Sequence, residues 1–406
     1  MKGFLKSSFK WLAILLVALP LSLYFILVII NLVDENKSPL VVAFEQKLEQ
    51  ISQVPDEDNA FIYFMGIEAP QGADVFDEGM KNIARLSKEP AHHSIDRKLL
   101  DISLLNEVHY KIISKCKAVN FAQDTCSKSL SSKKQEIDAL LNGTKVLQQR
   151  FETMSSLNAW FEIIPENTTM GIMGDYTLLK RLFDLQMLKI WRNAPNTSTE
   201  QTLEQLKQEA QFRHKVLLSS RTLMASSITL HLYNDFLRWA DIILADVIFT
   251  QGKTYHLATL FEPLPLNINF ERIAIGEWQF GKAVTKQIIK GSVDHNNPFE
   301  TILGFILQGL LNEQATYNLN AEILNIKWQQ SIDKKALITM KRQCEFNFTN
   351  ALLWYPYNLV GKMMLCPSIE EPIDYNAIRM LVVDESEALR NELIKKYAIK
   401  AKVNTP

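Results

Sequence analysis

Residues 11–33 read WLAILLVALPLSLYFILVIINLV, an apolar run of 23 residues that carries no charge. A helix of that length spans about 34 Å, which exceeds the bilayer hydrocarbon core of about 30 Å. Pro20 lies inside the run, and proline is tolerated in membrane helices. The run is longer than the apolar region of a cleaved signal peptide, and no small-x-small cleavage site follows it. The sequence therefore predicts an uncleaved transmembrane anchor, and a cleaved signal peptide is the alternative.

The charges on either side of this run predict its orientation. Residues 1–10 hold three lysines and no acidic residue, whereas Asp34 and Glu35 directly follow the run. Because an excess of Lys and Arg marks the cytoplasmic side, we expect residues 1–10 to form a cytoplasmic basic tail. Residues 34–406 would then lie outside the cytoplasm. A composition rich in Lys, Asn and Gln favours a Gram-negative inner membrane, with the bulk of the chain in the periplasm; a eukaryotic lumen is the alternative.

Composition predicts the fold class of the rest. The chain has 406 residues, of which 47% are hydrophobic and 22% charged, as in a globular protein rather than a disordered one. A mean hydropathy of -0.05 excludes a polytopic membrane protein. Gly and Pro number only 14 each, so turns are few and long helices are expected. We predict a mainly α protein, in which the single transmembrane helix precedes an all-α extracytoplasmic domain.

The arrangement of those helices is less constrained. No repeat of 34 or about 40 residues is visible, so the domain would be either an irregular α-solenoid or another multi-helix fold. The stretch LFEPLPLNIN, residues 260–269, holds two prolines and suggests a boundary near 252–268. We therefore expect one helical region over 34–251 and a second over 252–406, packed on the first.

Individual elements can be read from spacing and capping residues. Asp175 is expected to cap a helix with one broad apolar face, and another helix should run from Thr199 to about Leu218. The run AFIYFMGI, residues 60–67, is the best strand candidate, although so short an apolar run could equally begin a buried helix.

Three further segments are predicted to be helical. Long helices are expected over about 129–164 and 333–364. Residues 299–311 are too short to cross a bilayer, and Ile302 and Ile306 share a helical face, so we predict a core helix there. An interfacial helix is the alternative.

The cysteines bear on the compartment. Four are present, and chain order favours the pairs Cys116–Cys126 and Cys344–Cys366, whereas four free buried thiols are the alternative. Neither spacing resembles a zinc site, and we expect no metal and no cofactor.

The sequence gives only weak indications of a catalytic activity. The common nucleotide, zinc and hydrolase motifs are absent from the sequence. The segment ERIAIGEWQFGK, residues 271–282, places Glu271 and Glu277 near Trp278, and two acids beside aromatics could serve an enzyme acting on glycan or peptide. The competing interpretation is a closely packed helix, in which the glycines permit contact and the aromatics are core.

Three functional hypotheses follow. The first is an interaction or scaffold protein of the cell envelope, which binds the lipid bilayer through residues 11–33 and an envelope protein through its helical domain. The second is the paired-carboxylate envelope enzyme. The third, a lumenal transferase, would need strands and an acidic metal motif that the sequence does not suggest. Beyond the basic tail the chain is mildly acidic, so nucleic acid is not an expected partner.

Overall fold

The computed structural model describes residues 2–87, 100, 102–113, 123–164, 175–247, 255, 257–264, 270–291, 298–328, 334–370 and 375–403. Within these ranges the chain is helical and contains no β-strand, apart from an isolated bridge between Asn59 and Ala159. The predicted mainly α class is thereby confirmed.

The chain forms two compact units, and each is built from two separate stretches. Unit 1 comprises residues 1–49 and 278–373, and unit 2 comprises 50–277 and 374–406. The chain thus passes from unit 1 to unit 2, returns to unit 1 and ends in unit 2. Residues 252–268, where the sequence suggests a boundary, belong to the range of unit 2.

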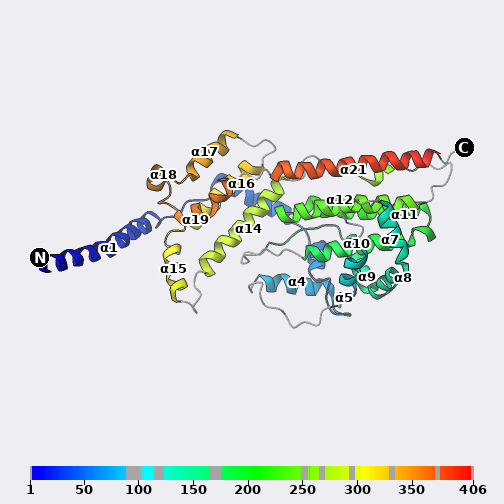
Figure 1. The fold of residues 1–406 in the computed structure, drawn as a ribbon, viewed down its shortest axis with the longest axis horizontal. Helices are drawn as coiled ribbons and strands as arrows, with labels where there is room; N and C mark the ends of the chain where they lie inside the picture. The colour runs from blue at the N-terminus through cyan, green and yellow to red at the C-terminus, as the bar shows by residue number, and fades with distance from the viewer. Residues whose placement is uncertain are drawn as a thin grey trace. The chain divides into compact units, whose positions relative to one another are not determined.

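Unit 1 begins with α1, which ends at Ile30 and contains Pro20. Its helices are α1 (Lys2–Ile30), α2 (Pro39–Ile51), most of α14 (Phe270–Gly291), α15 (Pro298–Gln308), α16 (Glu313–Trp328), α17 (Lys334–Cys344), α18 (Phe348–Leu353), α19 (Leu359–Leu365) and α20 (Pro367–Glu370). Figure 1 shows α15 to α19 gathered near the end from which α1 departs. Among the described residues, no helix combines the length and apolar character needed to cross a bilayer. The side chains of residues 11–14, where the predicted span begins, lie outside the described ones.

The prediction of one helix over 333–364 is wrong, because the segment is three helices. The first break lies between α17 and α18. Asn347 begins the next helix, because its side chain accepts a hydrogen bond from the backbone N–H of Asn350 and caps α18. Asn358 produces the second, with a left-handed φ of 52° before α19. The predicted disulfide Cys344–Cys366 is confirmed, and it joins α17 to the end of α19 within a small core that includes Ile323.

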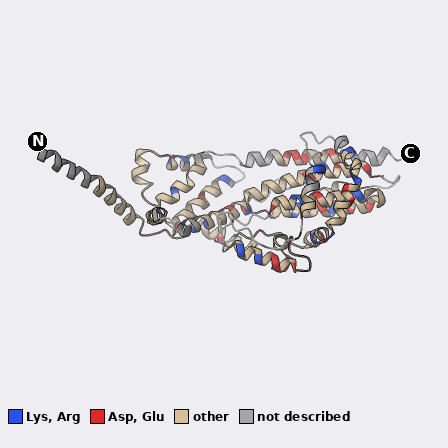
Figure 2. Ribbon diagram, turned by 60° about the horizontal axis from the view of Figure 1, so that its bottom comes forward, with Lys and Arg blue, Asp and Glu red and all other residues tan. Residues whose placement is uncertain are grey.

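Unit 2 is organised around α12 (Leu223–Asp246), which contacts α10, α11 and α21. Its other helices are α3 (Ala60–Met65), α4 (Val75–Leu86), α5 (Ser103–Val108), η2 (His109–Ile113), α7 (Gln123–Ser132), α8 (Lys134–Gly143), α9 (Lys145–Ser156), α10 (Tyr176–Asn193), α11 (Thr199–Ser219), α13 (Leu257–Leu260) and α21 (Tyr375–Val403). Figure 2 shows acidic and basic residues interspersed along the described helices.

The predicted helices at 175 and 199 are confirmed. Asp175 accepts a hydrogen bond from the backbone N–H of Leu178, and Ser198 caps α11 through a reciprocal pair of bonds with Gln201. Aromatic rings from three helices meet edge to face in the core between α9, α10 and α11: the centroids of Phe151, Phe183 and Phe212 lie 5.6 to 5.8 Å apart. Cys126 is buried, but Cys116 lies outside the described residues, so that disulfide stays a prediction.

Two other element predictions are corrected. The strand candidate at 60–67 is helix α3, because Asn59 caps it by accepting a hydrogen bond from the N–H of Phe61. The same side chain bonds the backbone of Phe161 at 2.9 Å, which places α3 beside a distant segment. The segment 129–164 is not one helix: it breaks after α7 and at Thr144, and it is non-helical from Leu157 onward.

The predicted core helix at 299–311 is also corrected. Its helix, α15, exists, and Leu310 after it is buried. However, Ile302 is 60% exposed and Ile306 is 39% exposed, so this face does not pack into a core.

Candidate functional site

The two acids singled out in the sequence lie on different faces of α14. They are six residues apart, which corresponds to about 240° around a helix. Glu271 is exposed, whereas the Glu277 carboxylate accepts a hydrogen bond of 2.6 Å from the backbone N–H of Leu223, at the start of α12. Burial, together with the nearby carboxyl of Glu162, raises the pKa of Glu277. The arrangement resembles a helix cap more than a pair of acids across a cleft.

Glu162 is a buried acid that the sequence analysis missed. Its Oε1 accepts a hydrogen bond of 2.5 Å from the hydroxyl of Tyr176, and its Oε2 accepts one of 2.8 Å from the backbone N–H of Arg221. Burial raises the pKa of Glu162 and lowers that of Arg221 to about 10. Because both oxygens are bonded within the fold, this cluster stabilises unit 2. The signal was a single charge inside the apolar run WFEII.

Gly276 explains why α14 can approach this cluster. A Cβ on Gly276 would lie 1.8 Å from the carbonyl oxygen of Arg221, far inside van der Waals contact. The glycines of the segment 271–282 therefore include at least one that close packing requires.

In unit 1, α1 is joined to the rest of the unit by a buried polar junction. Asn31 is 8% exposed, and its amide group donates hydrogen bonds of 2.7 Å to the carbonyl oxygens of Leu27 and Pro356. Its Oδ1 accepts one of 2.6 Å from the backbone N–H of Asn358. One side chain thus ties the last turn of α1 to the loop between α18 and α19.

Asp34 makes a second tie, three residues later. Its carboxylate accepts hydrogen bonds of 2.7 Å and 3.0 Å from the backbone N–H groups of Gln314 and Ala315. These groups open α16, where unpaired N–H groups and the helix dipole favour an anion. We call the contacts of Asn31 and Asp34 the α1 junction.

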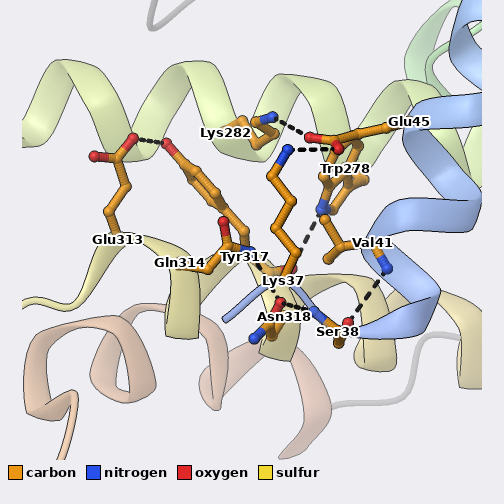
Figure 3. A network of polar contacts seen from close by, with 10 residues as sticks. All are labelled: Lys37, Ser38, Val41, Glu45, Trp278, Lys282, Glu313, Gln314, Tyr317 and Asn318. Atoms are coloured by element: carbon orange, nitrogen blue, oxygen red, sulfur yellow. Dashed lines mark hydrogen bonds and ion pairs between the residues drawn. The ribbon is translucent and has the colours of Figure 1, made fainter. Parts of the chain in front are cut away.

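A network of polar contacts extends this connection into α2 (Figure 3). The backbone N–H of Ser38 donates to Asn318 of α16 at 3.0 Å. Glu45 pairs with Lys37 at 2.7 Å and with Lys282 of α14 at 3.4 Å, and the Lys282 ammonium lies 4.5 Å from the centre of the Trp278 ring. Burial acts to raise the pKa of Glu45, but the two ammonium groups outweigh it and lower that pKa. The segment after α1 is therefore held along much of its length.

Unit 2 holds a polar pocket of about 440 Å³ between α9, α10 and α11. Its lining residues come from one turn of each helix: Glu152, Ser155, Ser156, Gln186, Lys189, Ile190, Gln205, Gln208 and Glu209. Glu152 and Lys189 form an ion pair there. The volume is within the range of pockets for small ligands.

Three side-chain oxygens of residues that line this pocket are buried without a hydrogen-bond donor among the described residues: Gln186 Oε1, Gln205 Oε1 and Glu209 Oε2. The nearest cation to Glu209 Oε2, Nη2 of Arg213, is 3.6 Å away, an ion-pair distance that is too long for a hydrogen bond. Burial raises the pKa of Glu209 to about 7, against the opposing effect of Arg213.

Buried polar atoms in native proteins are almost always bonded, so three unpaired acceptors on neighbouring helices are unusual. Because these oxygens are themselves buried, they do not face the open part of the pocket. The carboxylate and amide side chains that line the pocket suit a ligand with several hydrogen-bond donors, such as a protonated amine or a sugar. Across the described ranges, no three His, Cys, Asp or Glu side chains are placed to hold a metal ion.

Comparison with protein-family models, with curated proteins and with solved structures returns no match.

Proposed function

We propose that this chain is an interaction or scaffold protein of the cell envelope, held in the inner membrane by residues 11–33. The N-terminus would be cytoplasmic and the helical bulk periplasmic. The apolar side chains of α1 support this proposal, because those from Leu15 to Ile30 that are exposed include Leu16 at 68% and Leu19 at 66%. An isolated helix with so much exposed apolar surface requires a partner, and a bilayer fits its length.

The observation that carries the scaffold proposal is the α1 junction. A tether that only localises a domain needs no fixed geometry and is usually joined by a flexible linker. Here Asn31 and Asp34 bond α1 and the following segment to α16 and to the α18–α19 loop. Unit 1 would then keep a defined orientation on the membrane. A scaffold protein needs such an orientation because it has to hold its partners in fixed positions.

Topology is tested by fusing alkaline phosphatase after residue 60 and by extracting membranes with alkaline carbonate. We expect an active fusion that stays in the carbonate pellet. An inactive fusion would refute the N-in orientation, and release into the supernatant would refute the anchor. A fusion to a chain that lacks residues 1–33 should be inactive and serves as the control.

A second candidate function is ligand binding by unit 2, which the volume of the pocket and its lining by Glu152, Lys189 and Glu209 favour. The class of ligand is a small molecule with several hydrogen-bond donors. Calorimetric titration with glucosamine and with glucose separates a protonated amine from hydroxyl groups. Glu209→Gln should abolish binding of the amine, whereas Glu136→Gln, which changes an exposed carboxylate of α8, should not. Equal binding by both variants would refute a role for this pocket.

The alternative, an envelope enzyme with paired carboxylates, was expected from the sequence at Glu271 and Glu277; in this pocket it would use a different pair, Glu152 and Glu209. Of the acids described above, Glu152 and Glu209 line one pocket, whereas Glu271 and Glu277 lie on different faces of one helix. Hydrolysis of a glycan or peptide that Glu152→Gln eliminates would favour the enzyme over the scaffold.

A further inference from the structure

Unit 1 carries apolar side chains on its surface far beyond those of α1. On α15, Ile302 and Phe305 are each 60% exposed. On α18, Phe348 is 83% exposed and Leu353 is 76% exposed, and Phe346 just before it is 78% exposed. Such a concentration of large apolar side chains on a protein surface marks a site of interaction.

Unit 2 provides an internal comparison. Among the described residues of unit 2, two large apolar side chains have more than about a third of their surface exposed, and they are Met80 and Met224. Most exposed large apolar side chains among the described residues therefore belong to unit 1. Outside α1 and the residues just after it, they lie mainly on α15 and α18 with Phe346, and the others are Val42, Ile338 and Met363. We call the exposed side chains of α15 and α18, with Phe346, the apolar platform.

The apolar platform lies beside the end of α1. A Cβ placed on Gly309, directly after α15, would lie 3.0 Å from the hydroxyl of Tyr24 and 3.2 Å from Cγ2 of Val28. The carbonyl oxygen of Pro356, three residues after α18, accepts the hydrogen bond from Asn31. Both platform helices are thus joined to the last two turns of α1, in agreement with their places in Figure 1.

The place where the end of α15 contacts α1 agrees with the depth of an interfacial helix. Tyr24 precedes the end of α1 at Ile30 by six residues, which is about 9 Å along the helix axis. Amphipathic helices that lie in a membrane surface bury their apolar face about 5–10 Å into the boundary between headgroups and acyl chains. If α1 spans the bilayer, α15 ends at that depth.

The composition of the platform also suits lipid. Residues 346–361 contain no Asp, Glu, Lys or Arg, and they include the half-buried Trp354 and Tyr357. Tryptophan and tyrosine are enriched at membrane–water interfaces, where one end of the ring system is apolar and the other wet. Lys362 follows, with its ammonium 4.3 Å from the centre of the Trp354 ring.

We propose that the apolar platform inserts into the outer half of the same bilayer that α1 spans, so that unit 1 is held by one transmembrane helix and two interfacial helices. The occupant of the platform is the acyl-chain region of the lipid. A second protein on this surface would itself have to sit against the membrane, because both platform helices lie beside the last two turns of α1. This inference rests on the anchor proposed above.

The test places one nitroxide label on each of four variants of the full chain, every one with a single added cysteine, in vesicles of phosphatidylethanolamine and phosphatidylglycerol. Phe305→Cys and Leu353→Cys report on the platform, Leu23→Cys on the anchor, and Gln135→Cys on an exposed position of unit 2. The described cysteines include no free thiol, and the parent chain serves as the control for unwanted labelling. Relaxation by oxygen and by a water-soluble nickel chelate gives the depth of each label.

We expect Phe305→Cys and Leu353→Cys to lie about 5–10 Å below the headgroups, Leu23→Cys to be in lipid and Gln135→Cys to be in water. Platform labels in water, with the Leu23→Cys label in lipid, would overturn the platform alone. A Leu23→Cys label in water would overturn the anchor. Spin–spin broadening at the platform that disappears on dilution with unlabelled chain would show a second copy there and would also overturn the proposal. Because all platform positions are exposed, Ile302→Cys can replace a variant that is poorly produced.

Discussion

Replacing Asn31 with alanine should loosen the α1 junction selectively. The substitution removes two hydrogen bonds donated by the amide group and the acceptor of the Asn358 N–H, which is left buried without a partner in a residue that is 1% exposed. A hydrogen bond contributes about 1 kcal/mol, and an unpaired buried donor costs about 1–3 kcal/mol. We therefore expect local opening to become easier by about 2 kcal/mol or more, a factor of roughly 30.

Hydrogen exchange measured by mass spectrometry on peptides covering residues 356–361 reports this opening directly. In the full chain in detergent, Asn31→Ala should speed exchange of the Asn358 amide about 30-fold and leave α12 unchanged. Asn36→Ala is the matched control, since Asn36 is exposed and contributes its backbone carbonyl, rather than its side chain, to the contact with Asn318. Exchange within threefold of the parent rate in Asn31→Ala would refute the argument that this residue holds α1.

Three further predictions concern stability. Gly276→Ala should destabilise unit 2 by about 1–3 kcal/mol in urea unfolding, since its Cβ would overlap the Arg221 carbonyl, and a change below about 0.5 kcal/mol would contradict the close packing. The folded-state pKa of Glu209, about 7, is above that of an unfolded carboxyl, so its contribution to stability is full at acid pH and is lost as pH rises to 7. Glu209→Gln should therefore flatten the dependence of the unfolding free energy on pH between about 4.5 and 7, and a parallel curve would be evidence against the raised pKa. Replacing Cys344 and Cys366 with serine should cost about 3 kcal/mol, given the 22-residue separation of the pair, and unit 1 unfolding at the parent denaturant midpoint would count against that role.

Much of the helical architecture could be predicted because its signals are local. Asp175 and Ser198 precede periodic apolar runs, and both cap helices as such residues do. Residues 60–67 could not be assigned in this way, since an apolar run of that length suits a strand or a helix. The deciding contact is between Asn59 and Phe161, which are 102 residues apart.

The candidate sites were less predictable, for a related reason. The sequence suggests Glu277 as a catalytic acid because it is adjacent to a glycine and a tryptophan. In the structure its carboxylate instead accepts a hydrogen bond from the backbone N–H of Leu223, at the start of α12. The pocket between α9, α10 and α11 depends on Gln186, Gln205 and Glu209, which look like ordinary polar residues of solvent-exposed helix faces. Their oxygens become buried and unpaired only when three helices pack together.

The sequence by itself determined the helical class, the pairing of Cys344 with Cys366 and the long apolar helix at the N-terminus, because composition, chain order and periodicity are local properties. The tertiary structure decided which stretches share a unit and which apolar faces are covered. The face of α15 illustrates the difference: periodicity identifies Ile302 and Ile306 as neighbours on one face, but burial requires a second surface opposite them. In unit 1 the packing leaves that face open beside α1.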